Sequence, residues 1–128
     1  MCKEIGIPDI LKPLVGQDWI ELDSALKRCG GIDSYLPVLE IFYEVLDSNA
    51  DSIDEYYQDE DWEDYALKVH SLKSTARLVG AVPLGAEAEQ LEYASKNKDL
   101  DYIHANHKAF IDKYRSCKAP LEEIFDKD

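Results

Sequence analysis

The chain has 128 residues, the usual size of a single domain, and its 27 acidic side chains against 14 Lys and Arg give a formal net charge of −13. Apolar residues at 45% and charged residues at 32% are typical of a globular chain that buries one core. A charge of −13 repels phosphate backbones and anionic lipid, so we expect neither nucleic acid nor a membrane surface as a partner.

The cysteines and the N-terminal residues point to a reducing compartment. Cys2, Cys29 and Cys117 are odd in number and widely spaced, with no CxxC pair, which argues against a disulfide framework or a zinc site. The first ten residues, MCKEIGIPDI, lack the apolar stretch of a secretory signal. No apolar run approaches the roughly 18 residues that a membrane-spanning helix needs. We therefore expect a cytoplasmic protein.

Helical periodicity dominates the sequence, and no segment alternates with period two over a useful length. Two prolines, Pro8 and Pro13, restrict residues 1–17 to a short helix near Asp9–Val15. We treat this stretch as an N-terminal segment that precedes a helical domain over residues 18–128.

Five further helices are expected, a short one followed by four longer ones. They cover Trp19–Cys29, Asp33 or Ser34 to about Gln58, Asp61–Val79, Pro83–Lys96, and Asp99 to about Ile124. The expected caps are Asp18, then Asp33 or Ser34, and Asp99, whereas Asp61 opens its helix with acid in the first turn, which favours the helix dipole. The expected stops are Gly30, Gly31, Gly80 and Asn97. Asn49 and Ala50 form the one weak turn of the second helix, and Pro120 should kink or split the last. We predict an all-α protein, an antiparallel up-down four-helix bundle with one or two short extra N-terminal helices.

The helix over Asp61–Val79 carries a histidine away from its core stripe. The stripe recurs at steps of three and four residues and consists of Trp62, Tyr65, Val69, Leu72, Ala76 and Val79. At about 100° per residue, His70 lies about 140° from the middle of this stripe. We therefore expect its imidazole on the outside or the shoulder of the bundle.

The sequence around His70 differs in charge from the rest of the chain. The 22 residues of Tyr65–Ala86 contain no Asp or Glu, although about four or five would be expected from the composition. The same stretch holds Lys68, Lys73 and Arg77, and the last two share one flank of the helix with His70. An acidic chain has kept a neutral-to-positive patch around one exposed imidazole.

Small and apolar residues flank His70 along the outer face of the same helix. Ser74 lies one turn after His70, and Leu67 and Leu78 point outward before and after it. We expect these residues, together with Ser71, to form a shallow surface on which another protein docks.

The chemistry that such a site allows is narrow. Imidazole has an unperturbed pKa near 6.5, so a neutral ring nitrogen is available as a nucleophile. His70 has no Ser or Cys partner that it could activate as a nucleophile. A phosphoryl acceptor needs no such partner; it needs an accessible nitrogen, neighbouring cations and no nearby carboxylate. His70, Lys73 and Ser74 meet that description. From composition and geometry alone, an exposed histidine beside a lysine is more often a solvated helix face.

The run His70-Ser71-Leu72-Lys73-Ser74-Thr75-Ala76-Arg77-Leu78-Val79-Gly80-Ala81 resembles a known signature. It is similar to that of the histidine-containing phosphotransfer (HPt) domains of bacterial two-component phosphorelays, in which an acceptor His precedes x-Leu-Lys-Gly-small-Ala and then Leu-Gly-Ala. The flanking Asp61-Trp62, Glu89-Gln90-Leu91-Glu92 and Leu26-Lys27-Arg28-Cys29-Gly30-Gly31 also look like the family. The resemblance covers roughly residues 19–114 and implies a four-helix bundle with the histidine on its second helix.

By this resemblance, His70 would accept a phosphoryl group from a receiver-domain aspartate and pass it to another receiver. Lys73, with Arg77 on the same flank, would steady the phosphate or the partner. Ser74 stands where the family usually has Gly and would still let a receiver approach. The receiver would supply Mg²⁺ and the acidic cluster, because no carboxylate is expected beside His70. The chain would therefore need no cofactor of its own.

The expected partners are response-regulator receiver domains, and the chain is expected to be a monomer. The resemblance fits a free-standing protein or the terminal domain of a hybrid sensor histidine kinase, in which the kinase would act in cis. The sequence has no GxGxxG, P-loop or Gly-rich ATP lid, so it would carry phosphohistidine without an ATP site. The alternative is a non-catalytic helical adaptor that docks a signalling partner on the same surface.

Other candidate sites are weaker. His104 and His107, with Asp101, have a spacing that can hold a metal, but His107 falls in an apolar stripe and is expected in the core or on its shoulder. The acidic run over residues 59–64 lacks the spacing and the glycine of an EF-hand. We therefore expect no metal site in this chain.

Overall fold

The computed structural model describes residues 8–126, and within this range the chain is all-α and contains no strand. A 3-10 helix, η2 (Asp9–Leu14), comes first, as expected for the N-terminal segment. The α-helices are α1 (Leu22–Cys29), α2 (Ile32–Glu44), α3 (Leu46–Gln58), α4 (Trp62–Val79), α5 (Val82–Lys96), α6 (Leu100–Ser116) and α7 (Lys118–Phe125).

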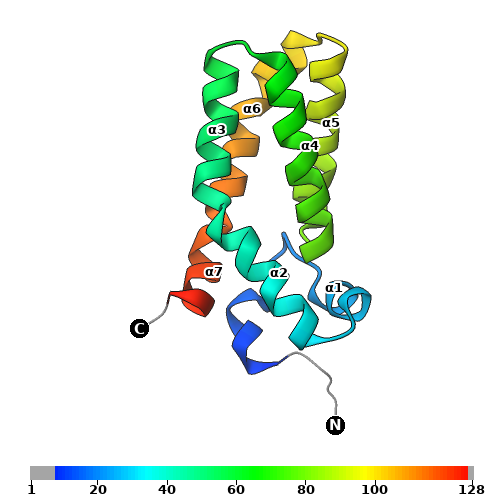
Figure 1. Ribbon diagram of the computed structural model, residues 1–128, viewed down its shortest axis with the longest axis vertical. Helices are drawn as coiled ribbons and strands as arrows, with labels where there is room; N and C mark the ends of the chain where they lie inside the picture. Colours follow the sequence, from blue (N-terminus) through cyan, green and yellow to red (C-terminus); the bar gives the residue numbers. More distant parts are fainter. Residues whose placement is uncertain (1–7, 127–128) are drawn as a thin grey trace.

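Helices α3, α4, α5 and α6 run alternately up and down and form the bundle (Figure 1). Helices α2 and α7 continue beyond its lower end, where η2 and α1 pack against them (Figure 1). The prediction of an up-down four-helix bundle with short extra N-terminal helices is confirmed. The helix that carries His70 is α4, the second helix of the bundle.

One hydrophobic core runs through the bundle and into its lower end. Its largest fully buried side chains are Tyr35, Tyr65, Tyr114, Phe42 and Phe110. Leu11 and Leu14 of η2 are also fully buried and belong to the same core. The boundary between residues 17 and 18 stays a prediction.

The predicted continuous helix to Gln58 is wrong, because it is two helices. The break lies at Val45, which has φ −94° and ψ 0°, and not at the weak turn of Asn49 and Ala50, which both lie inside α3. The apolar stripe keeps its step across the break, so periodicity could not show it. The bend lets α2 cover the lower end while α3 stays in the bundle. The start at Ile32 is also slightly earlier than expected, with Gly31 at the N-cap.

The predicted helix Trp19–Cys29 is shorter in the structure. Trp19 and Ile20 are buried but not helical, and Glu21, not Asp18, is the N-cap of α1. The backbone N–H of Glu21 donates to the carbonyl of Gly80 at 2.8 Å. Burial of the two apolar side chains and this bond hold the segment in a non-helical conformation, which outweighs its helical propensity.

The remaining helix bounds agree with their sequence signals. Asp61 and Asp99 cap α4 and α6 through their carboxylates, and α5 ends before Asn97. Gly80 ends α4 with φ +94°, a left-handed conformation that glycine adopts without cost. The last predicted helix is split at Cys117, because Pro120 has no N–H to donate to the carbonyl four residues before it.

Candidate functional site

The structure places His70 on the outer face of α4, as predicted. Its side chain is 53% exposed, whereas its neighbours Val69 and Leu72 are buried in the core. The ring therefore stands at the middle of a long helix, held by core packing beneath it and open to solvent above it.

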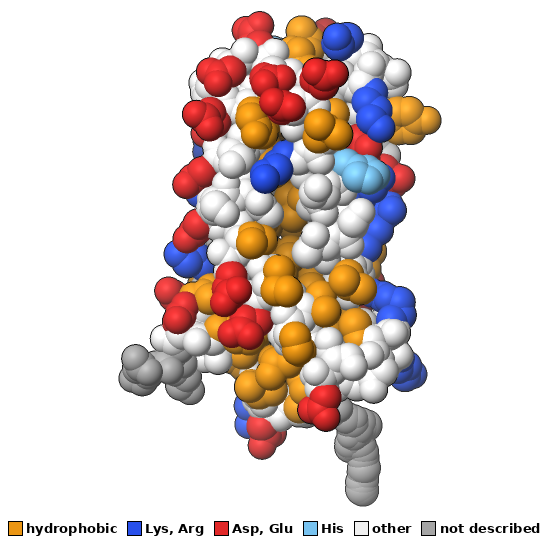
Figure 2. Space-filling model, in the orientation of Figure 1, with side chains coloured by type: hydrophobic (Ala, Val, Ile, Leu, Met, Phe, Trp, Pro, Cys, Tyr) orange, Lys and Arg blue, Asp and Glu red, His pale blue; other side chains and the backbone are white. Residues whose placement is uncertain are grey.

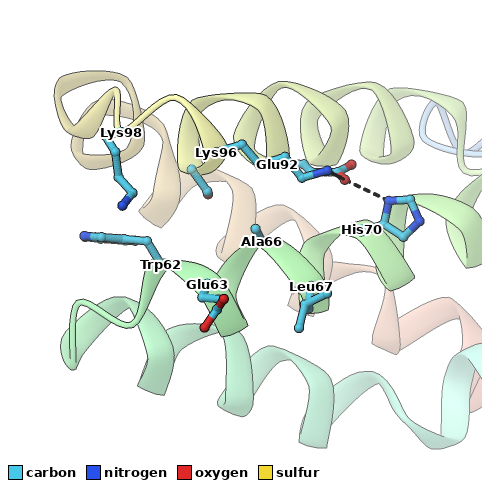
Figure 3. A pocket seen from close by; sticks show the side chains of 9 residues that line it. Trp62, Glu63, Ala66, Leu67, His70, Glu92, Lys96 and Lys98 are labelled. Atoms are coloured by element: carbon cyan, nitrogen blue, oxygen red, sulfur yellow. Dashed lines mark hydrogen bonds and ion pairs between the residues drawn. The ribbon is translucent and has the colours of Figure 1, made fainter.

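A carboxylate contacts the ring, which corrects the expectation that none lies beside it. Oε2 of Glu92, on α5, lies 2.8 Å from Nδ1 of His70, and the Glu92 side chain is only 7% exposed (Figure 3). The stretch without Asp or Glu, Tyr65–Ala86, is continuous along the chain. It therefore does not include Glu92, which lies farther along on the neighbouring antiparallel helix. His70 and Glu92 lie eleven residues on either side of Ala81 in the α4–α5 turn, and this symmetry could have found the pair.

Glu92 is held in its ionised form by cations. Burial alone would raise its pKa, but hydrogen bonds from Lys73, Lys96 and His70 outweigh burial and lower the pKa to about 2. Nζ of Lys73 lies 2.9 Å from Oε1, and Nζ of Lys96 lies 2.9 Å from Oε2. An ionised carboxylate only accepts hydrogen bonds, so Nδ1 of His70 must carry the proton. In the neutral ring, Nε2 then holds the free lone pair.

The predicted cationic flank of α4 faces α5. Lys73 is only 15% exposed on its side chain, and its charge is engaged with Glu92. Arg77 donates to Oε1 of Glu89 at 2.9 Å, in a pair that is about half exposed on both sides. In this arrangement both cations pair with carboxylates of α5, and the role of both in holding phosphate stays a prediction.

The predicted docking residues share one exposed line along α4. Leu67 is 64% and Leu78 is 46% exposed, and Ser71 and Ser74 between them are exposed as well. In Figure 2, Asp and Glu gather mainly over α3 and the upper end, Lys and Arg mainly along the opposite edge, over α5, and hydrophobic side chains between them. This face therefore combines apolar contact area with charged borders.

A groove that the sequence analysis missed opens beside His70, between α4 and α5. It has a volume of about 490 Å³, and Figure 3 shows the side chains that line it. Its lining includes Trp62, Ala66, Leu67, His70, Lys96 and Lys98. Trp62 belongs to the predicted core stripe, but it is only half-buried and supplies one wall. The lysines come from α5 and the turn after it, so only the folded hairpin brings them to this place.

His107 lies in the core, as predicted, and is 3% exposed. Its Nδ1 lies 3.0 Å from the hydroxyl of Tyr65, its Nε2 lies 2.9 Å from Oδ1 of Asp54, and its ring stacks on Tyr57 at 3.8 Å. In the part of the chain that the structure describes, no three His, Cys, Asp or Glu side chains are grouped to hold a metal ion.

No helix of residues 8–126 is long and apolar enough to cross a membrane.

A family model described as the Hpt domain matches residues 37–115, which is more than half of the chain and includes α4 and α5. Hpt domains act in histidine phosphotransfer in two-component signalling and interact with receiver domains. No curated protein and no solved structure matches the chain.

Proposed function

Since the chain belongs to the Hpt domain family, we propose that it is a phosphorelay intermediate whose phosphoryl acceptor is His70. One observation carries this proposal: the exposed ring of His70 has its Nδ1 hydrogen-bonded to the ionised Glu92, which leaves Nε2 as the nucleophile. A receiver domain supplies the phosphoryl group from its aspartyl phosphate, and a second receiver takes it away.

The transfer is a displacement at phosphorus. The lone pair on Nε2 of His70 forms the new N–P bond while the bond from phosphorus to the aspartyl oxygen breaks, and the aspartate leaves as a carboxylate. The Nδ1 proton stays in its hydrogen bond to Glu92 throughout. Because the phosphorylated ring still carries that proton, it gains positive charge, and the carboxylate of Glu92 stabilises it.

Lys73 and Lys96 keep Glu92 ionised, and this positioning role follows from their contacts. Arg77 contributes positive charge on the same flank. Ser74, exposed one turn from the ring, leaves room for the receiver where the family usually has glycine. Glu92 is already bonded to three groups, which supports the expectation that the receiver provides Mg²⁺ and its ligands.

Docking uses the face of α4 from Leu67 to Leu78 and the groove beside His70, which fits one apolar side chain of a partner. Transient signalling contacts are small, so an exposed apolar line with charged borders suits a partner that must also leave. Receivers as partners of this chain, a kinase in cis, the monomeric state and the cytoplasmic location remain predictions.

The test is phosphotransfer from a receiver domain charged with acetyl phosphate. The wild-type chain should acquire label that is stable to base and lost in acid, and His70→Gln should acquire none. His104→Gln is the matched control, because His104 is a second exposed histidine, on α6. Label that persists on His70→Gln would overturn the site. Receiver binding without label on the wild type would favour the adaptor instead.

A further inference from the structure

The lower end of the α4 face is bordered by α1, which lies outside the matched residues 37–115. Arg28 of α1 reaches α4, and its Nη2 donates to the carbonyl of Arg77 at 2.6 Å. Arg28, Ser74, Arg77, Leu78 and Val82 line one shallow hollow of about 390 Å³. The hollow therefore begins one helical turn from His70 and includes two docking residues, Ser74 and Leu78.

The chain fixes α1 firmly at this place. Besides the bond from Arg28, the N–H of Glu21 donates to the carbonyl of Gly80 at 2.8 Å. The hydroxyl of Tyr35, on the following helix α2, donates to the carbonyl of Val79 at 2.7 Å. The C-terminal end of α4 thus obtains three hydrogen-bond donors from the residues before α3. The guanidinium of Arg28 is anchored through one N–H, and its other donors have no partner in the described part of the chain.

The hollow lies within reach of any protein that docks on His70. Leu78 follows His70 by eight residues, which is about 12 Å along a helix. A transient interface that buries about 600 Å² per partner has a radius of about 14 Å. A receiver centred on His70 therefore reaches Leu78 and the hollow that Leu78 lines together with Arg28.

The charge of the hollow defines the chemistry of what it contacts. Arg28 is exposed, and within residues 8–126 no carboxylate lies at ion-pair distance from it, whereas Arg77 is paired with Glu89. In a chain with a net charge of −13, a guanidinium with no carboxylate partner among residues 8–126, beside the apolar Leu78 and Val82, suits a carboxylate on the partner.

We propose that Arg28 is a specificity-determining contact, which binds an acidic side chain on the surface of the partner receiver. This inference rests on the proposed function. A receiver with an acidic side chain opposite Arg28 gains a charge-assisted hydrogen bond. A receiver without such a side chain shields Arg28 from water and leaves its charge unpaired. Arg28 thereby selects among receivers that would all reach His70.

The experiment uses the full chain and the receiver domain that phosphorylates the wild type fastest in the acetyl phosphate assay. Arg28→Glu should lower kcat/KM for transfer about tenfold, through a higher KM with little change in kcat. Arg28→Lys should retain most of the activity. The loss should shrink as salt rises from about 50 to about 500 mM, because salt screens exposed charges.

Two variants separate charge from folding. Arg28→Gln keeps a donor for the Arg77 carbonyl without the charge, and it should also raise KM. Lys108→Glu makes the same charge change on α6, away from α4, and should transfer like the wild type. The inference alone would be overturned if Arg28→Glu and Arg28→Gln had the same KM as the wild type. It would also be overturned if Lys108→Glu lost as much kcat/KM as Arg28→Glu. No transfer to the wild type would overturn the proposed function itself.

Discussion

Glu92 links the chemistry of His70 to the neighbouring helix. Its carboxylate contacts the ring nitrogen that faces α5 and two lysines, while it is almost completely shielded from water. A charge-assisted hydrogen bond of this kind fixes both the orientation and the tautomer of an imidazole. Although 53% of the His70 side chain is exposed, its reactive atom is therefore defined by a buried group.

Replacing Glu92 by Gln tests this role. The variant keeps a similar shape but loses the negative charge that stabilises the phosphorylated ring. We expect the maximal rate of phosphotransfer to fall about tenfold, the size of one charge-assisted hydrogen bond. Single-turnover transfer at saturating receiver measures it. Glu89→Gln, one turn earlier on α5 and paired with Arg77, is the matched control and should stay within about twofold. Equal rates for both variants would contradict the role of Glu92.

At the scale of elements, the α4–α5 hairpin determines which residues meet. The turn at Gly80 and Ala81 sets the antiparallel register that brings Glu92 opposite His70. Gly80 has φ +94°, and a Cβ there would lie 2.7 Å from the backbone oxygen of Glu21. The same glycine thus ends α4 and lets the segment before α1 approach it closely.

We therefore expect Gly80→Ala to destabilise the fold by at least about 2 kcal/mol, because backbone strain and a backbone clash add together. Gly30→Ala is the comparison, since Gly30 has φ +85° but no atom within 4 Å of the added Cβ. Its cost should be strain alone, about 1–2 kcal/mol. Urea denaturation of both variants measures the difference, and a Gly80→Ala cost no larger than that of Gly30→Ala would contradict the close approach.

The elements show what sequence can predict. Both ends of α4 and the start of α6 could be predicted, because Asp61, Gly80 and Asp99 act on backbone groups within a few residues. The break at Val45 was not, because it depends on how α2 packs on the lower end, and the apolar stripe continues through it. The non-helical conformation of Trp19 and Ile20 likewise depends on a core formed by distant parts of the chain.

At the scale of the whole molecule, a polar cluster connects three bundle helices. His107 of α6 accepts from the hydroxyl of Tyr65 of α4 at Nδ1 and donates to Asp54 of α3 at Nε2, if its ring is neutral and Asp54 is ionised. Burial lowers the pKa of His107 below its ordinary 6.5, and the hydrogen bond that the ring donates to Asp54 offsets this only in part. The folded protein thus favours the neutral ring.

This cluster predicts a pH dependence of stability. In the unfolded chain, His107 takes up a proton near pH 6.5, whereas in the folded chain its ring stays neutral to lower pH. The unfolding free energy should therefore fall as the pH drops below about 6.5. His107→Gln should cost about 1–3 kcal/mol at pH 7 and should lose part of this pH dependence. Urea denaturation at pH 7.5 and pH 5.5 checks it. An unchanged pH dependence in the variant would show that His107 is not its source.

Part of the candidate site could be predicted from the sequence, and part could not. The outward position of His70 and the exposed Leu67, Ser74 and Leu78 follow from the helical period of a single helix. Glu92 was missed because a count of charges along the chain does not see across a hairpin. Arg28 reaches the same face only through the packing of α1, which no local pattern encodes.

The central claim is that Nε2 of His70 carries the phosphoryl group while Nδ1 keeps its proton. Phosphorus-31 and nitrogen-15 NMR of the phosphorylated chain, labelled at histidine, tests it most directly. We predict that phosphorus is bonded to Nε2 of His70 and that Nδ1 carries a proton, which is hydrogen-bonded to Glu92. Phosphorus on Nδ1, on another residue or on none would contradict it.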